Sequence, residues 1–141
     1  MLYVALSFEG AFAETILHNT VRQPIGLHAI SDRAVTTLVA NRAIRLVDLC
    51  GPGLARLGLD AAIFSGPYEP CGLWADALHG HPDRPDGILY PSRHDPSEIC
   101  AAVFERDDLS FVPAAEAVPL GSRLTEVNRL MTRYGKALEP L

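Results

Sequence analysis

The chain has 141 residues, 48% of them hydrophobic, which is enough for one domain with its own buried core. Its net charge is −5 and its 12 basic residues are scattered, so the sequence lacks the basic patch that direct DNA or RNA binding needs. No apolar run reaches the roughly 18 residues of a membrane span, and no basic stretch precedes the apolar start, so we expect a soluble, cytoplasmic protein without a membrane partner.

The first predicted elements are a strand and a helix. Residues 2–6 form a short apolar run typical of a buried strand, and Ser7 can cap a helix over residues 8–19. Glu14 and His18 fall one turn apart, beside the apolar face of that helix. They could line the edge of a cleft or simply meet water. The apolar face itself contains Phe8, Phe12, Thr15 and Ile16.

The middle of the chain is broken by glycine and proline. Residues 23–26 predict a turn, a helix should begin near Asp32, and residues 43–49 predict a strand that ends at Gly51-Pro52-Gly53. Two helices follow, over residues 54–57 and 71–78, and a polar loop over residues 80–86 separates them from the last third.

The last third predicts three strands and a helix. The strands cover residues 87–90, 99–105 and 109–112, and the helix runs from after Ser122 to about Tyr134. Its apolar residues Leu130, Met131 and Tyr134 could contact a partner or a second copy, although most such stripes face their own core. The mixture indicates a single α+β domain over residues 1–141, with a mixed, mainly antiparallel sheet and flanking helices.

Three patterns suggest sites that the spacing does not support. The G-x-G turn at Gly51 has Arg56 where a dinucleotide site needs its third glycine, so we interpret it as a tight turn. His79 and His81 fit no familiar zinc spacing, and the three separated cysteines are better explained as reduced, packed thiols, so we expect no metal. Ser92, His94 and Asp95 are too close in sequence to converge as a catalytic triad.

Residues 86–93 are more informative. An apolar strand delivers the hydroxyl of Ser92 and the guanidinium of Arg93 to its exposed end, and such groups suit a phosphate or a ribose. A polar turn explains them nearly as well.

Three segments in this order and spacing resemble the RES-domain family, the toxins of bacterial RES–Xre toxin–antitoxin pairs. They are Leu2-Tyr3-Val4-Ala5 with Ala11-Phe12-Ala13-Glu14, then Trp74-Ala75, then Asp86-Gly87-Ile88-Leu89-Tyr90-Pro91-Ser92-Arg93 with Ala102-Val103-Phe104. The resemblance spans residues 2 to about 112.

The family is named for an arginine, a glutamate and a serine. By position Glu14 looks like the glutamate, Ser92 like the serine, and Tyr3 like the tyrosine of the family's ligand pocket. The family's arginine lies before the strand that holds Tyr3, so no position of this chain is assigned to it. We expect that the arginine-bearing segment is missing here, or that another residue such as Arg93 supplies the phosphate contact.

The resemblance implies a fold similar to ADP-ribosyltransferase toxins, with NAD as a substrate and no true cofactor. It also implies an Xre-like antitoxin as partner, in a complex that can hold a second copy of the chain. Cleavage of the bond between nicotinamide and ribose builds positive charge on the sugar, and one carboxylate can stabilise it. We expect Glu14 to be that catalytic carboxylate, with Tyr3, Ser92 and Arg93 binding NAD; the alternative is a surface glutamate, a core tyrosine and a turn serine.

Three functions are compatible with the resemblance. The first is NAD glycohydrolysis or phosphorolysis, in which water or phosphate takes the ADP-ribosyl group. The second is ADP-ribosyl transfer to a protein, which uses the same glutamate. The third is a catalytically silent binding module that retains the fold and the antitoxin-binding surface but lacks the family's arginine.

Overall fold

This computed structural model describes residues 1–17, 24–65 and 68–139 and contains one four-stranded sheet among those residues. The strand order is β1-β7-β6-β5. The pairs β1–β7 and β6–β7 are antiparallel, and β5–β6 is parallel. The strands are β1 (Leu2–Ala5), β5 (Leu46–Asp48), β6 (Gly87–Pro91) and β7 (Ile99–Val103). This is the α+β architecture with a mixed, mainly antiparallel sheet that the sequence predicts.

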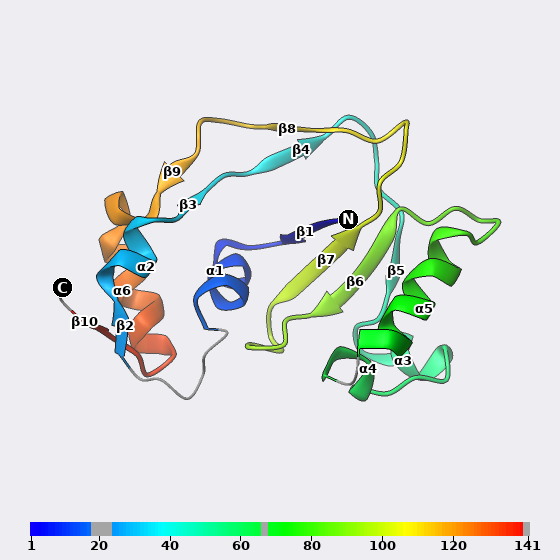
Figure 1. Cartoon of the computed structure of the whole chain (residues 1–141), viewed down its shortest axis with the longest axis horizontal. Coiled ribbons are helices and arrows are strands. Elements are labelled where there is room, and N and C mark those ends of the chain that lie inside the picture. The colour runs from blue at the N-terminus through cyan, green and yellow to red at the C-terminus, as the bar shows by residue number, and fades with distance from the viewer. Residues whose placement is uncertain (18–23, 66–67, 140–141) are drawn as a thin grey trace.

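Helix α1 (Phe8–Ile16) lies between this sheet and the helices at the other end of the molecule (Figure 1). Ser7 caps it as predicted, because its Oγ accepts a hydrogen bond from the backbone N–H of Gly10 at 3.0 Å. The helix ends at Ile16, earlier than predicted, and the expected end at Asn19 lies outside the described residues, as does His18.

The main apolar core joins α1 to the C-terminal helix α6 (Leu124–Arg133), the short helix α2 (Leu27–Ser31) and the 3₁₀ turn η1 (Leu120–Ser122). Leu130 is fully buried and Met131 is 2% exposed, while Tyr134 packs against the cluster from its edge. The apolar stripe of the last helix therefore faces its own core rather than a partner. The fully or nearly buried members are Phe12, Ala13, Ile16, Leu17, Ile30, Leu120, Val127, Leu130 and Met131.

Two predictions for residues 23–35 are wrong. Pro24–Gly26 is not a turn but strand β2, which pairs in parallel with β10 (Ala137–Glu139), and Gln23 lies outside the described residues. The partner strand is more than 100 residues away, so local sequence carries no signal of the pairing. No helix begins near Asp32; α2 ends there, and Asp32 is its C-cap.

Two narrow ribbons and three helices complete the fold. The ribbons pair β3 (Ala34–Val35) with β9 (Val118–Pro119) and β4 (Leu38–Ala40) with β8 (Phe111–Pro113). They run along one side of the molecule and connect its two ends (Figure 1). Beyond β5 lie α3 (Pro52–Arg56), α4 (Ala62–Ser65) and α5 (Tyr68–His79). Among the described residues, no helix is long and apolar enough to cross a membrane.

A buried ion pair fixes the start of β6. Asp86 is only 3% exposed, and its two carboxylate oxygens each accept a hydrogen bond from Arg42 at 2.9 Å. The backbone N–H of Arg45 donates to the same carboxylate. The bonds from Arg42 lower the pKa of Asp86 to about 2 against the opposing effect of burial. The strand that leads to Ser92 thus begins at a charge-paired anchor.

Candidate functional site

Glu14 and Ser92 are in direct contact, although 78 positions separate them in the sequence. The Oγ of Ser92 donates a hydrogen bond to Oε1 of Glu14 at 2.5 Å, and the backbone N–H of Arg93 donates to the same oxygen at 3.0 Å. The Glu14 side of α1 faces the end of β6, so a half-buried carboxylate meets the turn that follows this strand. Two of the three residues singled out by the resemblance are therefore in contact.

The direction of the Ser92 hydroxyl is fixed by its surroundings. Ser92 is 1% exposed, and its Oγ accepts hydrogen bonds from the backbone N–H groups of His94 and Asp95, both at 3.2 Å. Because these two donors occupy the lone pairs of the oxygen, its single proton is left for Glu14. Ser92 here contacts His94 and Asp95 through their backbone, so the three residues do not form a catalytic triad.

Tyr90 is close enough to Glu14 to be affected by its charge, although no sequence motif marked it as a site residue. Burial raises the pKa of Tyr90 to about 12, and the charge of Glu14 contributes in the same direction. Its ring stacks on Phe64 with centroids 6.2 Å apart. Side chains alternate along a strand, so Tyr90 and Ser92 project to the same side, and this spacing is the signal that could have found it.

Cys100 lies on the same face, opposite Tyr90 in the adjacent strand. Burial raises the pKa of its thiol to about 11, with the charge of Glu14 as the next cause. The thiol is therefore protonated and unreactive at neutral pH. The three cysteines of the chain are free, and Cys100 is buried while Cys50 and Cys71 are half-buried.

Tyr3 lies two strands from Tyr90 on one face of the sheet. In the pairing of β1 with β7, Tyr3 lies opposite Ala102 and Ala5 lies opposite Cys100, on the same face. On its other side, Cys100 lies opposite Tyr90 of β6. The Tyr3 side chain is 66% exposed, so it is not a core tyrosine. Its ring is accessible on the face that carries Glu14 and Tyr90.

Arg93 takes part in this arrangement through its backbone. Its N–H binds Glu14, while the residue itself is exposed. Among the residues that the structure describes, no carboxylate forms an ion pair with its guanidinium. The predicted contact of Arg93 with a phosphate stays a prediction.

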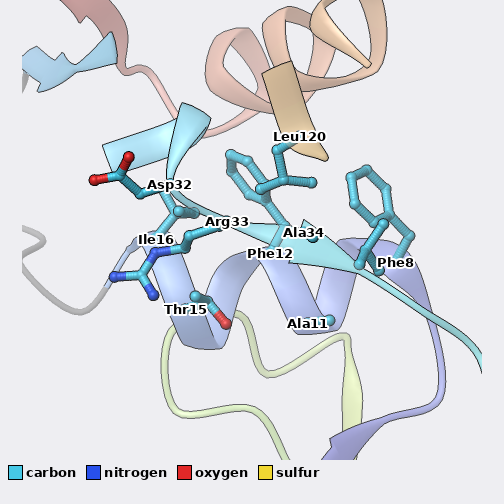
Figure 2. Close-up of a pocket in the computed structure, with 10 residues that line it drawn as sticks. Phe8, Ala11, Phe12, Thr15, Ile16, Asp32, Arg33, Ala34 and Leu120 are labelled. Atoms are coloured by element: carbon cyan, nitrogen blue, oxygen red, sulfur yellow. The ribbon is translucent and has the colours of Figure 1, made fainter. Parts of the chain in front are cut away.

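Two cavities lie elsewhere. One, of about 260 Å³, separates α1 from the segment that carries Asp32 and Arg33, with Phe8, Phe12 and Ile16 along the helix side (Figure 2). The other, of about 270 Å³, lies between the α3–α4 connection and α5. Glu14, Ser92 and Tyr3 line neither of them, so the candidate site is separate from both.

The other motifs have structural explanations. Gly51 has a positive φ of 52°, and a Cβ on Gly53 would lie 1.9 Å from the carbonyl oxygen of Asp48, as in the tight turn that we predicted. His79 packs edge-on against Phe104 with centroids 5.4 Å apart. Within the described ranges, no three His, Cys, Asp or Glu side chains are grouped so that they could hold a metal ion.

Comparison with known proteins identifies the family of this chain. The RES domain family matches residues 1–122. A protein from Sinorhizobium fredii (strain NBRC 101917 / NGR234), named "Probable toxin y4kH", is 31% identical over 84 residues. That alignment covers 59% of this chain and 65% of the relative, slightly less than two thirds of its length. No solved structure matches the chain, so its predicted similarity to ADP-ribosyltransferase toxins stays a prediction. The family match covers most of the chain and includes Tyr3, Glu14 and Ser92, and the chain therefore belongs to the RES domain family.

Proposed function

We propose that this protein is a RES-type toxin that cleaves the nicotinamide–ribose bond of NAD, with Glu14 as the catalytic carboxylate. Family membership supports the class, and the name of the Sinorhizobium fredii relative supports a role as a toxin. The observation that carries the proposal is the hydrogen bond from Ser92 to Glu14, because it holds one carboxylate in a defined position.

The reaction needs charge stabilisation more than proton transfer. Nicotinamide leaves as a neutral base and takes the electron pair of the broken bond, so positive charge develops on the ribose carbon and its ring oxygen. Water or phosphate then forms the new bond to that carbon, and its proton is released to solvent. A fixed carboxylate near the sugar lowers the barrier by a few kcal/mol, since it does not have to reorganise during the reaction.

The geometry of Glu14 suits this role. Oε1 is occupied by two donors, and among the described residues no group donates to Oε2. We assign Oε2 to the substrate, where it binds a ribose hydroxyl and faces the developing charge. The hydrogen bonds to Oε1 set the orientation of the carboxylate before the substrate arrives.

The remaining residues have binding roles in this proposal. The exposed ring of Tyr3 stacks on the nicotinamide end of NAD, and the protonated hydroxyl of Tyr90 offers a hydrogen-bond donor beside Glu14. The guanidinium of Arg93 contacts the pyrophosphate of NAD. Ser92 acts through Glu14, as a positioning residue.

The test is nicotinamide release from NAD, measured by chromatography for the purified protein with and without phosphate. We expect release in the wild type and a loss of at least about 100-fold in Glu14→Gln, which keeps the size of the side chain but not its charge. Glu9→Gln is the matched control, because Glu9 lies on the same helix and pairs with Arg129 on the surface. It should stay within about twofold of wild type.

The same assay separates the alternatives. An ADP-ribose product indicates hydrolysis, and a phosphorylated ADP-ribose indicates phosphorolysis. A mass gain on a protein acceptor, with little free ADP-ribose, would instead identify an ADP-ribosyltransferase. No nicotinamide release together with firm binding of an Xre-like protein would identify a silent binding module and refute the enzyme. Co-purification with the Xre-like antitoxin tests that part of the proposal.

A further inference from the structure

The C-terminal helix contacts the turn that carries Ser92, although it lies beyond the residues that match the RES family. The hydroxyl of Tyr134, at the C-cap of α6, donates a hydrogen bond to Oδ2 of Asp95 at 2.7 Å. Arg133 reaches the same oxygen at 3.3 Å and lies 3.7 Å from Glu98. Arg133 and Tyr134, which lie outside the family match, therefore hold the turn that faces Glu14.

Asp95 organises this turn through each of its polar groups. Its Oδ1 accepts hydrogen bonds from the backbone and hydroxyl of Ser97, and its carbonyl accepts one from the N–H of Glu98. Its own N–H donates to Ser92 Oγ. With Oδ1 directed into the turn, Oδ2 points to α6, and Tyr134 is its half-buried partner there.

The turn at Asp95 affects Glu14 through the hydroxyl of Ser92 and through the backbone N–H of Arg93. The backbone N–H groups of His94 and Asp95 occupy the acceptor positions of Ser92, which directs the serine proton to Glu14. The N–H of Arg93, which lies between Ser92 and His94 in the same turn, also binds Glu14. Any rotation of the turn at Asp95 therefore moves both donors of the carboxylate at once.

From these contacts we propose that Tyr134, acting through Asp95, is a positioning residue for Glu14. The proposal deepens the assignment of Glu14 as catalytic carboxylate and rests on it. Tyr134 holds the turn after β6, the turn holds Ser92 and Arg93 in place, and these two hold the carboxylate.

Tyr134 is better suited to this task than Arg133. The side chain of Arg133 is 42% exposed, and an exposed ion pair contributes little. Tyr134 packs against the main core, next to the fully buried Leu130. Burial, followed by the bond to Asp95, raises the pKa of Tyr134 to about 12, so the phenol stays a donor throughout the neutral range.

The experiment compares Tyr134→Phe with Arg129→Gln in NAD cleavage. Both variants remove one contact of α6, but Arg129 is 56% exposed and pairs with Glu9 on α1 and not with a residue of the turn. We expect kcat to fall about tenfold in Tyr134→Phe while KM stays within about twofold, because the carboxylate is displaced and not removed. Arg129→Gln should leave both constants near wild type, and the thermal midpoints of the two variants show whether either is unfolded.

A second measurement does not depend on catalysis. Amide hydrogen exchange of Arg93, His94 and Asp95 reports on the bonds to Ser92 and Glu14. We expect these three amides to exchange about tenfold faster in Tyr134→Phe and unchanged in Arg129→Gln. Equal exchange in the two variants overturns the proposal, and so does faster exchange with an unchanged kcat. A wild type that releases no nicotinamide would refute the enzyme assignment. If the three amides still exchange faster in Tyr134→Phe, the conclusion that Tyr134 positions the turn remains supported.

Discussion

Replacing Ser92 by alanine tests the physical core of the site without assuming any activity. The substitution leaves the backbone N–H groups of His94 and Asp95 without their acceptor, and it removes one of the two donors to Glu14. Ser92 is 1% exposed, so water does not simply replace its oxygen. Three hydrogen bonds are lost with a single atom.

The expected cost follows from those three bonds. An unsatisfied buried donor costs about 1–3 kcal/mol, and His94 and Asp95 are only half-buried, so the lower end applies to each. The charge-assisted bond to a half-buried carboxylate contributes about 1 kcal/mol more. Ser92→Ala should therefore lower the free energy of unfolding by about 3 kcal/mol, a large part of the roughly 5–15 kcal/mol of an ordinary domain.

Urea unfolding measures this difference. We expect a lower midpoint at unchanged m-value, followed by circular dichroism and by the fluorescence of Trp74, the single tryptophan, as a check on two-state behaviour. Ser122→Ala is the matched control, because the hydroxyl of Ser122 is exposed and donates to the carbonyl of Pro119, three residues away. Its cost should be below about 0.5 kcal/mol.

A double-mutant cycle isolates the contact with the carboxylate. Combining Ser92→Ala with Glu14→Ala should reveal a coupling of about 1 kcal/mol, because the two side chains share one hydrogen bond. If Ser92→Ala costs no more than Ser122→Ala, or if the cycle shows no coupling, then the hydroxyl does not hold Glu14 and our account of the site is wrong.

Two further predictions concern the sheet. Asp86 has a pKa of about 2 in the folded protein against 3.8 ordinarily, so its bonds contribute about 2 kcal/mol of stability, present above about pH 4 and lost as the pH falls towards 2. The difference in unfolding free energy between wild type and Asp86→Asn should therefore shrink between pH 5 and pH 2 in urea titrations, and a constant difference would contradict the cause given. Gly87→Ala should cost at least about 2 kcal/mol in thermal unfolding, because its Cβ would lie 2.2 Å from the carbonyl oxygen of Ala102. Gly80→Ala, whose Cβ would be 3.5 Å from the nearest atom, should change stability by less than about 1 kcal/mol, and equal effects of the two would refute the steric argument.

The sequence predicts those parts of the fold whose signals are local. The apolar runs of β1, β6 and β7 and the cap at Ser7 identify their elements, because apolar runs and capping depend on neighbouring residues. Strand β2 is missed because β10, at the far end of the chain, supplies its partner. The false helix after Asp32 has a related cause, since β3 and β4 are stabilised by β9 and β8 across the ribbons.

The same distinction between local and long-range signals applies to the candidate site. The resemblance singled out Glu14 and Ser92, and the structure brings them into contact, which periodicity alone could not indicate, because the contact joins a helix to a distant turn. Tyr90 could have been found from its spacing to Ser92. The bond between Tyr134 and Asp95 has no sequence signal, since both residues are of types common at surfaces and only the packing of α6 brings them together.

The position of Glu14 depends on two packing arrangements at once. Phe12 and Ile16 hold α1 in the main apolar core, while Gly10 lets the same helix approach the sheet so closely that a Cβ there would lie 3.1 Å from that of Ala5. Ser92 directly follows strand β6 of the sheet, whereas Tyr134 packs against the main apolar core. A substitution that loosens either arrangement therefore changes the geometry of the carboxylate before it unfolds the protein, because the contact between Glu14 and Ser92 is where the two arrangements meet. For this chain, changes in the core between α1 and α6 should reduce any Glu14-dependent activity more steeply than they reduce stability.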